Sequence, residues 1–264
     1  MRRVLVLAAA PVLSLAVVLV FAPSPHSQSA SRTRLPSPGV VLPSPPRPAW
    51  AVPAPVALAT GRGVSRWAPV RQAVIARSAP APDAAPVAAV SARTPEGTTD
   101  ILELVGRATA RASGLWQRVL LAALPNGTTG WVPRSALGGS TFVDTRLVIY
   151  RARMTATLFR SEQQLFTAPI GIGQRQSPTP RGTFYVRDVL TRYASPAYGP
   201  VAFGTSARSP TLTDWPAGGY VGIHGTNRPD LVPGVISHGC IRMRNFDILR
   251  LARLMPVGTP VIVK

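Results

Sequence analysis

The side chains best suited to covalent chemistry lie close together near the C-terminus of this 264-residue chain. Cys240 is the only cysteine, and His224 and His238 are two of the three histidines. A thiolate is a strong nucleophile, an imidazole can take the thiol proton, and backbone N–H groups of a glycine-containing turn can stabilise an oxyanion. The spacing therefore predicts catalytic roles for Cys240, His224, His238 and Gly239.

Cys240 could also have a structural role. A lone cysteine is most often a small, buried apolar side chain. Cys240, however, follows a Ser-His-Gly sequence and precedes Arg242 and Arg244. Such an electropositive turn favours a thiolate. We therefore favour a nucleophile.

Zinc binding is the second alternative, because one cysteine and two histidines are a plausible catalytic zinc set. Structural zinc sites usually take four ligands, and the only acidic residues nearby are Asp230 and Asp247. We expect no metal at this site.

The same segment carries a resemblance to a known family. The sequences His224-Gly-Thr-Asn-Arg-Pro229 and Ser237-His-Gly-Cys-Ile-Arg-Met243 resemble the L,D-transpeptidase catalytic (YkuD) family of bacterial cell-wall enzymes. The resemblance covers residues 143–264 and includes Thr179-Pro-Arg-Gly182, which is similar to the family's Thr-Pro-x-Gly turn. No motif position departs from the family pattern.

The resemblance implies a two-step acyl transfer without a metal or organic cofactor. Cys240 would attack the bond between the third residue and the terminal D-Ala of a peptidoglycan tetrapeptide stem, and D-Ala would leave. An amine from an acceptor stem would then resolve the thioester and form a 3→3 cross-link. Family members are inactivated by carbapenems, which would acylate the same thiol.

The resemblance and the chemistry together assign roles to the surrounding residues. His224 would be the general base, held in one tautomer by a backbone carbonyl, and the N–H groups of His238, Gly239 and Cys240 are candidates for the oxyanion hole. Arg242 would bind a stem carboxylate through its planar fork. The remaining predicted substrate-binding residues are Ser237, Gly225, Tyr198 and Trp215.

Alternatives to these roles stay open. Arg242 could instead form a structural ion pair with Asp230 or Asp247. Water in place of an amine would make the protein an L,D-carboxypeptidase. A non-catalytic wall-binding protein is a third possibility, against which the intact set of Cys240 and two histidines argues.

The N-terminus is predicted to be an export segment. Met1-Arg2-Arg3 is a positive start, and residues 4–22 form an uncharged apolar run of 19 residues. This length just spans a bilayer and exceeds the usual core of a signal peptide, so residues 1–22 are a signal anchor or a signal peptide, with the anchor favoured. The positive end stays in the cytoplasm and the rest lies outside.

Two further segments precede the catalytic domain. Residues 23–83 hold 13 of the 29 prolines and no acidic residue before Asp83, which predicts a disordered Pro/Ala/Arg-rich linker. Short β-like runs separated by turn residues predict a small β domain over residues 84–140. Its closing segment, with Trp116, Gly127 and Trp131, resembles the bacterial SH3-like module of wall enzymes.

Residues 143–264 are predicted to be mainly β, a YkuD-like β-sandwich or barrel with one short C-terminal helix. Alternating apolar residues predict strands at residues 147–150, 155–160, 164–173 and 183–190. The connection 193–219, with Tyr193, Tyr198, Phe203 and Trp215, is the predicted lid. Asn245 is predicted to cap the helix, with Asp247 in its first turn. The apolar face of that helix comprises Ile248, Leu251, Ala252 and Met255.

The net charge of +19 divides into +9 for residues 1–82, +1 for 83–142 and +9 for 143–264. The positive charge alone would suit a nucleic-acid-binding protein. An exported chain without a recognition motif, however, is more consistent with anionic wall polymers and phospholipid as binding partners. The single cysteine has no disulfide partner within the chain. We expect a monomer in the cell wall or periplasmic space, membrane-anchored or secreted, which binds donor and acceptor stem peptides and no nucleic acid.

Overall fold

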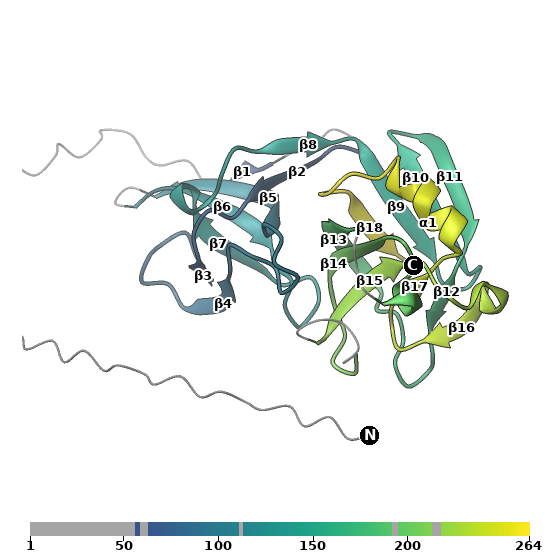
Figure 1. The fold of residues 1–264 in the computed structure, drawn as a ribbon. Coiled ribbons are helices and arrows are strands. Elements are labelled where there is room, and N and C mark those ends of the chain that lie inside the picture. Colours follow the sequence, from purple (N-terminus) through teal and green to yellow (C-terminus); the bar gives the residue numbers. More distant parts are fainter. Residues whose placement is uncertain (1–55, 59–62, 111–112, 192–194, 213–217) are drawn as a thin grey trace, which may run out of the picture. The chain divides into compact units, whose positions relative to one another are not determined.

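The computed structural model of the protein describes residues 56–58, 63–110, 113–191, 195–212 and 218–264. These residues belong to one compact unit. Strands dominate it, and its described part contains a single α-helix (Figure 1). The prediction of a mainly β fold with one short C-terminal helix is confirmed.

The first sheet is built from residues 56–143. Its neighbouring strands follow the order β4-β3-β7-β6-β5-β2-β8, and β1 pairs with β5. The bounds are β1 Val56–Ala57, β2 Ser65–Pro69, β3 Val74–Arg77, β4 Pro86–Val90, β5 Ile101–Ala110, β6 Gly114–Leu120, β7 Thr129–Pro133 and β8 Thr141–Val143, with a 3₁₀ turn η1 at Arg134–Ala136. Side chains of alternating polarity let these strands enclose a separate apolar core around Val119 and Val132.

The second sheet is built from residues 145–263, and its neighbouring strands follow the order β11-β10-β9-β18-β13-β14-β15-β17-β12-β16. The bounds are β9 Thr145–Tyr150, β10 Thr155–Arg160, β11 Gln163–Pro169, β12 Gly171–Gly173, β13 Gly182–Leu190, β14 Ala202–Arg208, β15 Tyr220–His224, β16 Gly234–Ser237, β17 Ile241–Arg242 and β18 Pro260–Val263, with 3₁₀ turns η2 Pro196–Tyr198 and η3 Pro229–Leu231. The strands predicted at 147–150, 155–160 and 183–190 are confirmed, whereas the segment predicted at 164–173 forms two strands, β11 and β12.

Strand β13 joins the two halves of the second sheet. Its first residues, from Gly182 to Tyr185, pair with β18, whereas Val186 and later residues pair with β14. The register shifts between Val186 and Asp188. A strand that changes partners in this way lets one sheet curve around a core.

Helix α1, Asn245–Ala252, covers this core with one face. Ile248 and Leu251 are fully buried, and Met255 is buried just beyond the helix, as the spacing predicts. The N-cap is Arg244, so the prediction that Asn245 caps the helix is wrong. The Asn245 Oδ1 atom instead accepts the backbone N–H of Thr226 at 2.9 Å, which ties the helix to the loop after β15.

Two sequence-based boundaries are also wrong. The linker predicted for residues 23–83 includes β2 and β3, which pair with β5 and with β4 and β7 in the first sheet. Prolines do not prevent this, because Pro69 ends β2 and Ser65–Trp67 also pair with β8. Similarly, the lid predicted for 193–219 contains β14, an interior strand of the second sheet.

The predicted export segment, residues 1–22, lies outside the described residues. Within the described ranges, no helix is long and apolar enough to cross a membrane. The SH3-like resemblance of residues 84–140 stays a prediction.

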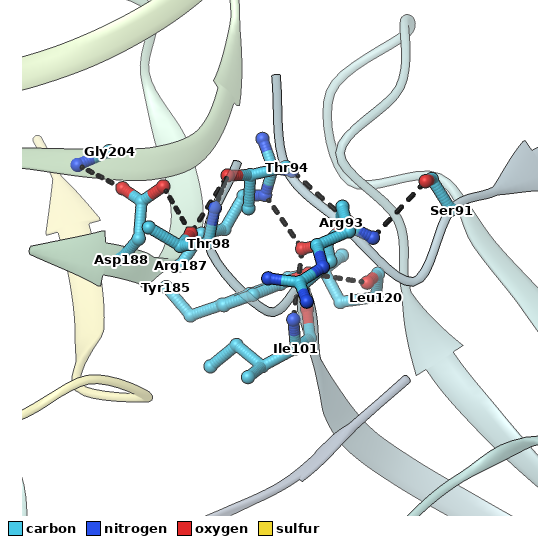
Figure 2. A network of polar contacts seen from close by, with 11 residues as sticks. Ser91, Arg93, Thr94, Thr98, Ile101, Leu120, Tyr185, Arg187, Asp188 and Gly204 are labelled. Atoms are coloured by element: carbon cyan, nitrogen blue, oxygen red, sulfur yellow. Dashed lines mark hydrogen bonds and ion pairs between the residues drawn. The ribbon is translucent and has the colours of Figure 1, made fainter. Parts of the chain in front are cut away.

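Buried polar contacts join the first sheet to strand β13 (Figure 2). The Tyr185 hydroxyl, which is fully buried, donates to the carbonyl oxygens of Ile101 (3.1 Å) and Leu120 (3.3 Å). Arg187 lies two residues after Tyr185 in β13. Its guanidinium donates through Nε and Nη2 to both carboxylate oxygens of Asp100, each at 3.1 Å. A bidentate pair of this kind fixes orientation as well as distance.

Further contacts extend the junction along the neighbouring strands. Thr98 Oγ1 donates to the Asp188 carboxylate at 3.1 Å, and the Gly204 N–H donates to the same carboxylate at 3.0 Å. The Asn126 side chain donates to the Arg208 carbonyl at 2.7 Å and accepts the Arg208 N–H at 2.9 Å. The first sheet thus holds both β13 and β14.

The buried pair generates the first prediction. Burial lowers the pKa of Arg187, but the Asp100 carboxylate outweighs this effect and raises it above its usual value. Replacing Arg187 with Met would leave a nearly buried carboxylate unpaired, so we expect the free energy of unfolding to fall by about 3–5 kcal/mol. Chemical denaturation measures this loss.

The matched control is Arg228→Met. Arg228 pairs with Asp230 at the same 3.1 Å, but both side chains are 60% exposed, so little change in stability is expected. Equal effects of the two variants would contradict a structural role for the buried pair.

Candidate active site

Strands β15 and β17 bring the predicted catalytic residues together. They are parallel neighbours in which Ile223 pairs with Ile241 and His224 with Arg242. The Met243 N–H donates to the His224 carbonyl at 2.8 Å and extends this ladder. His224 is therefore the last residue of one strand, and Cys240 directly precedes the strand beside it.

Cys240 and His224 line the same pocket, whose volume is about 240 Å³. Its lining residues are Ala197, Tyr198, Leu212, His224, Ser237, His238, Cys240 and Arg242. Five of the predicted catalytic and substrate-binding residues besides Cys240 thus border one cavity. Cys240 itself is buried, with 5% of its surface exposed, and this pocket offers a reactant access to it.

The sulfur of Cys240 has a backbone donor. The Gly222 N–H points at Sγ with an N···S distance of 3.3 Å. An N–H dipole directed at sulfur stabilises the thiolate relative to the thiol. This contact suits a nucleophile, and the sequence did not reveal it, because Gly222 lies 18 residues before Cys240.

His224 is held in a single tautomer. Its Nδ1 lies 2.6 Å from the Gly225 carbonyl oxygen, which can only accept, so Nδ1 carries the proton and Nε2 is the basic atom. Burial lowers the pKa of His224 to about 4, with the positive charge of Arg242 adding to the decrease and the Gly225 hydrogen bond opposing it. The imidazole is therefore neutral at neutral pH and ready to accept a proton.

Tyr198 packs on the base. The ring centroids of Tyr198 and His224 are 4.6 Å apart and the planes are tilted by 50°. Tyr198 belongs to η2 and lines the pocket. Tyr193 and Trp215, which were predicted to lie in the same lid, fall outside the described residues.

The turn before the thiol is braced by Ser237. Its Oγ donates to the Cys240 carbonyl at 2.6 Å and accepts the Gly239 N–H at 3.2 Å. Gly239 has a φ of +125°, a backbone conformation that favours glycine. The Gly239 N–H is thus used within the turn in this structure, and its place in the oxyanion hole stays a prediction. The prediction for the His238 and Cys240 N–H groups is not tested.

Arg242 faces the pocket without an acidic partner. None of the ion pairs in the described part of the chain includes it, and Asp230 pairs with Arg228 instead. The Arg242 Nε atom is buried and has no hydrogen-bond partner. An unsatisfied buried donor is costly, and a bound carboxylate would satisfy it.

Gly225 positions the His224 ring and is not part of the pocket lining. It is buried and does not line the pocket, so the structure does not place it where a substrate would lie. A Cβ atom at Gly225 would come within 3.0 Å of Gly199 and closer still to the Asn245 side chain, so only glycine fits. Its carbonyl holds His224.

Thr179 is a positioning residue that the sequence-based analysis did not single out. Its hydroxyl accepts the Gly173 N–H at 2.9 Å and donates to the Gly239 carbonyl at 2.9 Å. It is fully buried. The Thr-Pro-x-Gly motif was the available indication, but the motif does not show that its threonine contacts the Cys240 turn.

Comparisons with known proteins identify similar catalytic domains. Residues 144–263 match the family model of the L,D-transpeptidase catalytic domain, YkuD. The putative L,D-transpeptidase YkuD of Bacillus licheniformis is 35% identical over 118 residues, which cover 45% of this chain and 64% of that relative. Its namesake from Bacillus subtilis is 37% identical over 109 residues, or 41% and 59% of the two chains. The chain spans less than two thirds of the length of both relatives.

A solved L,D-transpeptidase from Mycobacterium smegmatis aligns with 57% of this chain and 90% of that chain, at 16% identity and a TM-score of 0.36. This likeness is too weak to carry an argument about the site. The fold and the pocket define a mainly β domain with a buried histidine beside a Ser-His-Gly-Cys turn. The match of residues 144–263 to the family model of YkuD L,D-transpeptidase catalytic domains confirms the resemblance found in the sequence.

The contacts of Thr179 generate a prediction. Thr179→Val removes the hydroxyl but keeps the shape, and leaves the Gly239 carbonyl and the Gly173 N–H unsatisfied. We expect the rate of Cys240 alkylation by iodoacetamide to change by a factor of about five or more. The reason is that a buried group left without its hydrogen-bond partner costs about 1–3 kcal/mol, and the affected turn carries the thiol. Thr179→Ser, which retains the hydroxyl, should restore the parent rate. Equal rates in the parent and Thr179→Val would show that the turn does not need this residue.

The depressed pKa of His224 generates a pH prediction. The unfolded chain binds a proton at His224 below about pH 6.5, whereas the folded protein does so only near pH 4. The contribution of His224 to the free energy of unfolding is therefore fully present above pH 6.5. It is lost as the pH falls to about 4, and the loss is on the order of 3 kcal/mol. His224→Gln should flatten that part of the stability curve, measured by urea unfolding between pH 4 and 7. The exposed His238 is the control, and a similar flattening by His238→Gln would contradict the assignment.

Proposed function

We propose that the protein is a cell-wall L,D-transpeptidase that forms 3→3 peptidoglycan cross-links through a Cys240 acyl-enzyme. One observation carries the proposal: the pocket is lined by Cys240 and by a neutral His224 whose Nδ1–H is held by a carbonyl. The sulfur thus shares its pocket with an imidazole of fixed tautomer. This is the arrangement that nucleophilic acyl transfer requires.

In the first step, Nε2 of His224 takes the thiol proton and Sγ of Cys240 attacks the carbonyl carbon of the L-to-D peptide bond. A C–S bond forms, and the carbonyl oxygen becomes an oxyanion stabilised by backbone N–H groups of the turn. The C–N bond then breaks, and D-Ala leaves with the proton from His224. The product is a thioester on Cys240.

In the second step, a side-chain amine of an acceptor stem attacks the thioester. His224 accepts a proton from the attacking nitrogen, the C–S bond breaks, and the proton returns to Cys240. The balance is one peptide bond exchanged for another, so no oxidant, metal or cofactor enters. Arg242 would hold a stem carboxylate through its unsatisfied guanidinium.

The site of action follows from the substrate. Peptidoglycan stems lie outside the cytoplasmic membrane, so we place the catalytic domain there. Residues 1–22 would anchor the chain in the membrane or direct its secretion, and the protein would act as a monomer. We expect carbapenems to acylate Cys240.

The proposal is tested by incubating the full chain with a disaccharide-tetrapeptide and analysing the products by mass. A cross-linked dimer that has lost one D-Ala is the expected result, and Cys240→Ala should form neither dimer nor carbapenem adduct. Disaccharide-tripeptide without any dimer would show that water resolves the acyl-enzyme, which would make the protein an L,D-carboxypeptidase. An unchanged substrate would contradict both.

The two histidines should differ in their contributions. His224→Gln removes the proton acceptor, so we expect the acylation rate to fall by on the order of 10² or more, and Cys240 to require a higher pH for alkylation. His238→Gln should have the smaller effect in both assays, because His238 is exposed. The reverse order in both measurements would make His238 the base.

A further inference from the structure

Three neighbouring strands of the second sheet meet at one edge. β18 runs parallel to β9, with Val263 beside Ile149, and antiparallel to β13, with Val263 opposite Gly182. The ends of β9 and β18 therefore lie beside the start of β13. Since adjacent strands are about 4.8 Å apart, residues just beyond these ends lie within about 10 Å of one another.

Four cations occupy this edge, and we call them the strand-end cluster: Arg151, Arg153, Arg181 and Lys264. The Arg153 guanidinium and the Lys264 ammonium lie 5.4 and 5.8 Å from the centre of the Tyr150 ring. The Arg151 N–H donates to the Lys264 carbonyl oxygen at 3.2 Å. Arg153, Arg181 and Lys264 are exposed.

No acidic side chain of the described residues neutralises this cluster. Its four cations take part in none of the ion pairs found in the described ranges. Asp144 and Glu162 pair at the opposite end of β9 and β10 with Arg160 and Arg146. A terminal carboxylate at Lys264 would offset one of the four charges and leave three.

Two cations of the cluster, Arg151 and Arg181, also repel each other. Burial of its side chain and the positive charge of Arg181 both lower the pKa of Arg151. The Arg151 Nε atom is buried and has no hydrogen-bond partner in the structure. Mutual repulsion and an unsatisfied guanidinium donor are two separate costs, and a bound anion would relieve both.

The geometry points to the strand-end cluster as a docking surface for a linear polyanion whose repeating groups are phosphates. Phosphate oxygens suit arginine forks, and a chain of phosphates can contact cations spread over three strand ends. The surface is separate from the catalytic pocket, since none of the four residues lines it. Docking would keep the enzyme on an anionic polymer between turnovers.

A membrane surface fits the cluster less well. Peripheral membrane sites combine cations with apolar side chains that enter the lipid. The exposed large apolar residues of the described chain lie in other segments, at Val56, Ile75, Val87, Leu115, Leu124, Phe142, Leu231, Val235, Phe246 and Leu249. The segments that form the strand-end cluster therefore contribute charge but no exposed large apolar side chain for insertion.

The test compares two triple variants of the full chain with the same net charge. The first replaces Arg153, Arg181 and Lys264 with Gln. The second replaces Arg146, Arg160 and Arg228 with Gln. The charges of these three arginines are already paired with Glu162, Asp144 and Asp230. Linear polyphosphate of fixed length is the probe, and affinity is measured by titration at two salt concentrations without any turnover.

We expect the first variant to lose roughly tenfold to a hundredfold in affinity for polyphosphate, and the second to lose much less. The melting temperatures of the first variant and the parent should agree, which excludes unfolding as the cause. Equal losses in both variants would show that net charge alone drives binding and would overturn the proposal. It is also overturned if the parent binds phosphatidylglycerol vesicles but not polyphosphate through these residues, because the partner would then be a membrane.

Discussion

The site depends on a very short parallel pairing between β15 and β17. Two residue pairs, Ile223 with Ile241 and His224 with Arg242, hold the end of one strand beside the start of the next. Two pairs of strand residues supply little energy on their own. The pairing persists because Ile223 and Ile241 are fully buried in the apolar core, so the catalytic geometry rests on hydrophobic packing directly beneath it.

Burial of His224 has opposing consequences. Removal from water makes the charged imidazole unfavourable, which keeps the base neutral but weakens it as a proton acceptor. The Gly225 carbonyl compensates in part, because it stabilises the protonated ring and fixes which nitrogen faces the pocket. A histidine with a lowered pKa holds a proton best when a negative charge lies nearby. The thiolate of Cys240 would supply such a charge.

The sequence was sufficient to predict features whose residues lie close together along the chain. The Ser-His-Gly-Cys turn, the alternating strands β9 to β13 and the buried face of α1 were all predicted. Partners distant along the chain were not, because nothing local in the sequence marks them. Gly222 beneath the sulfur and Thr179 behind Gly239 are examples. The prolines around β2 and β3 suggested a linker, since composition does not show that β5 offers β2 a partner or that β4 and β7 offer partners to β3.

The Tyr220 ring lies close to two guanidinium groups. Arg187 and Arg208 lie 4.4 and 4.0 Å from the ring centre, and Asp100 and Asn126 of the first sheet hold these two arginines. Tyr220 begins the strand that ends at His224. Exchange of residues 56–143 for an unrelated domain would thus leave Arg187 without Asp100 and Arg208 without Asn126. Evolution by domain shuffling is therefore restricted here, and the two sheets are expected to be inherited together.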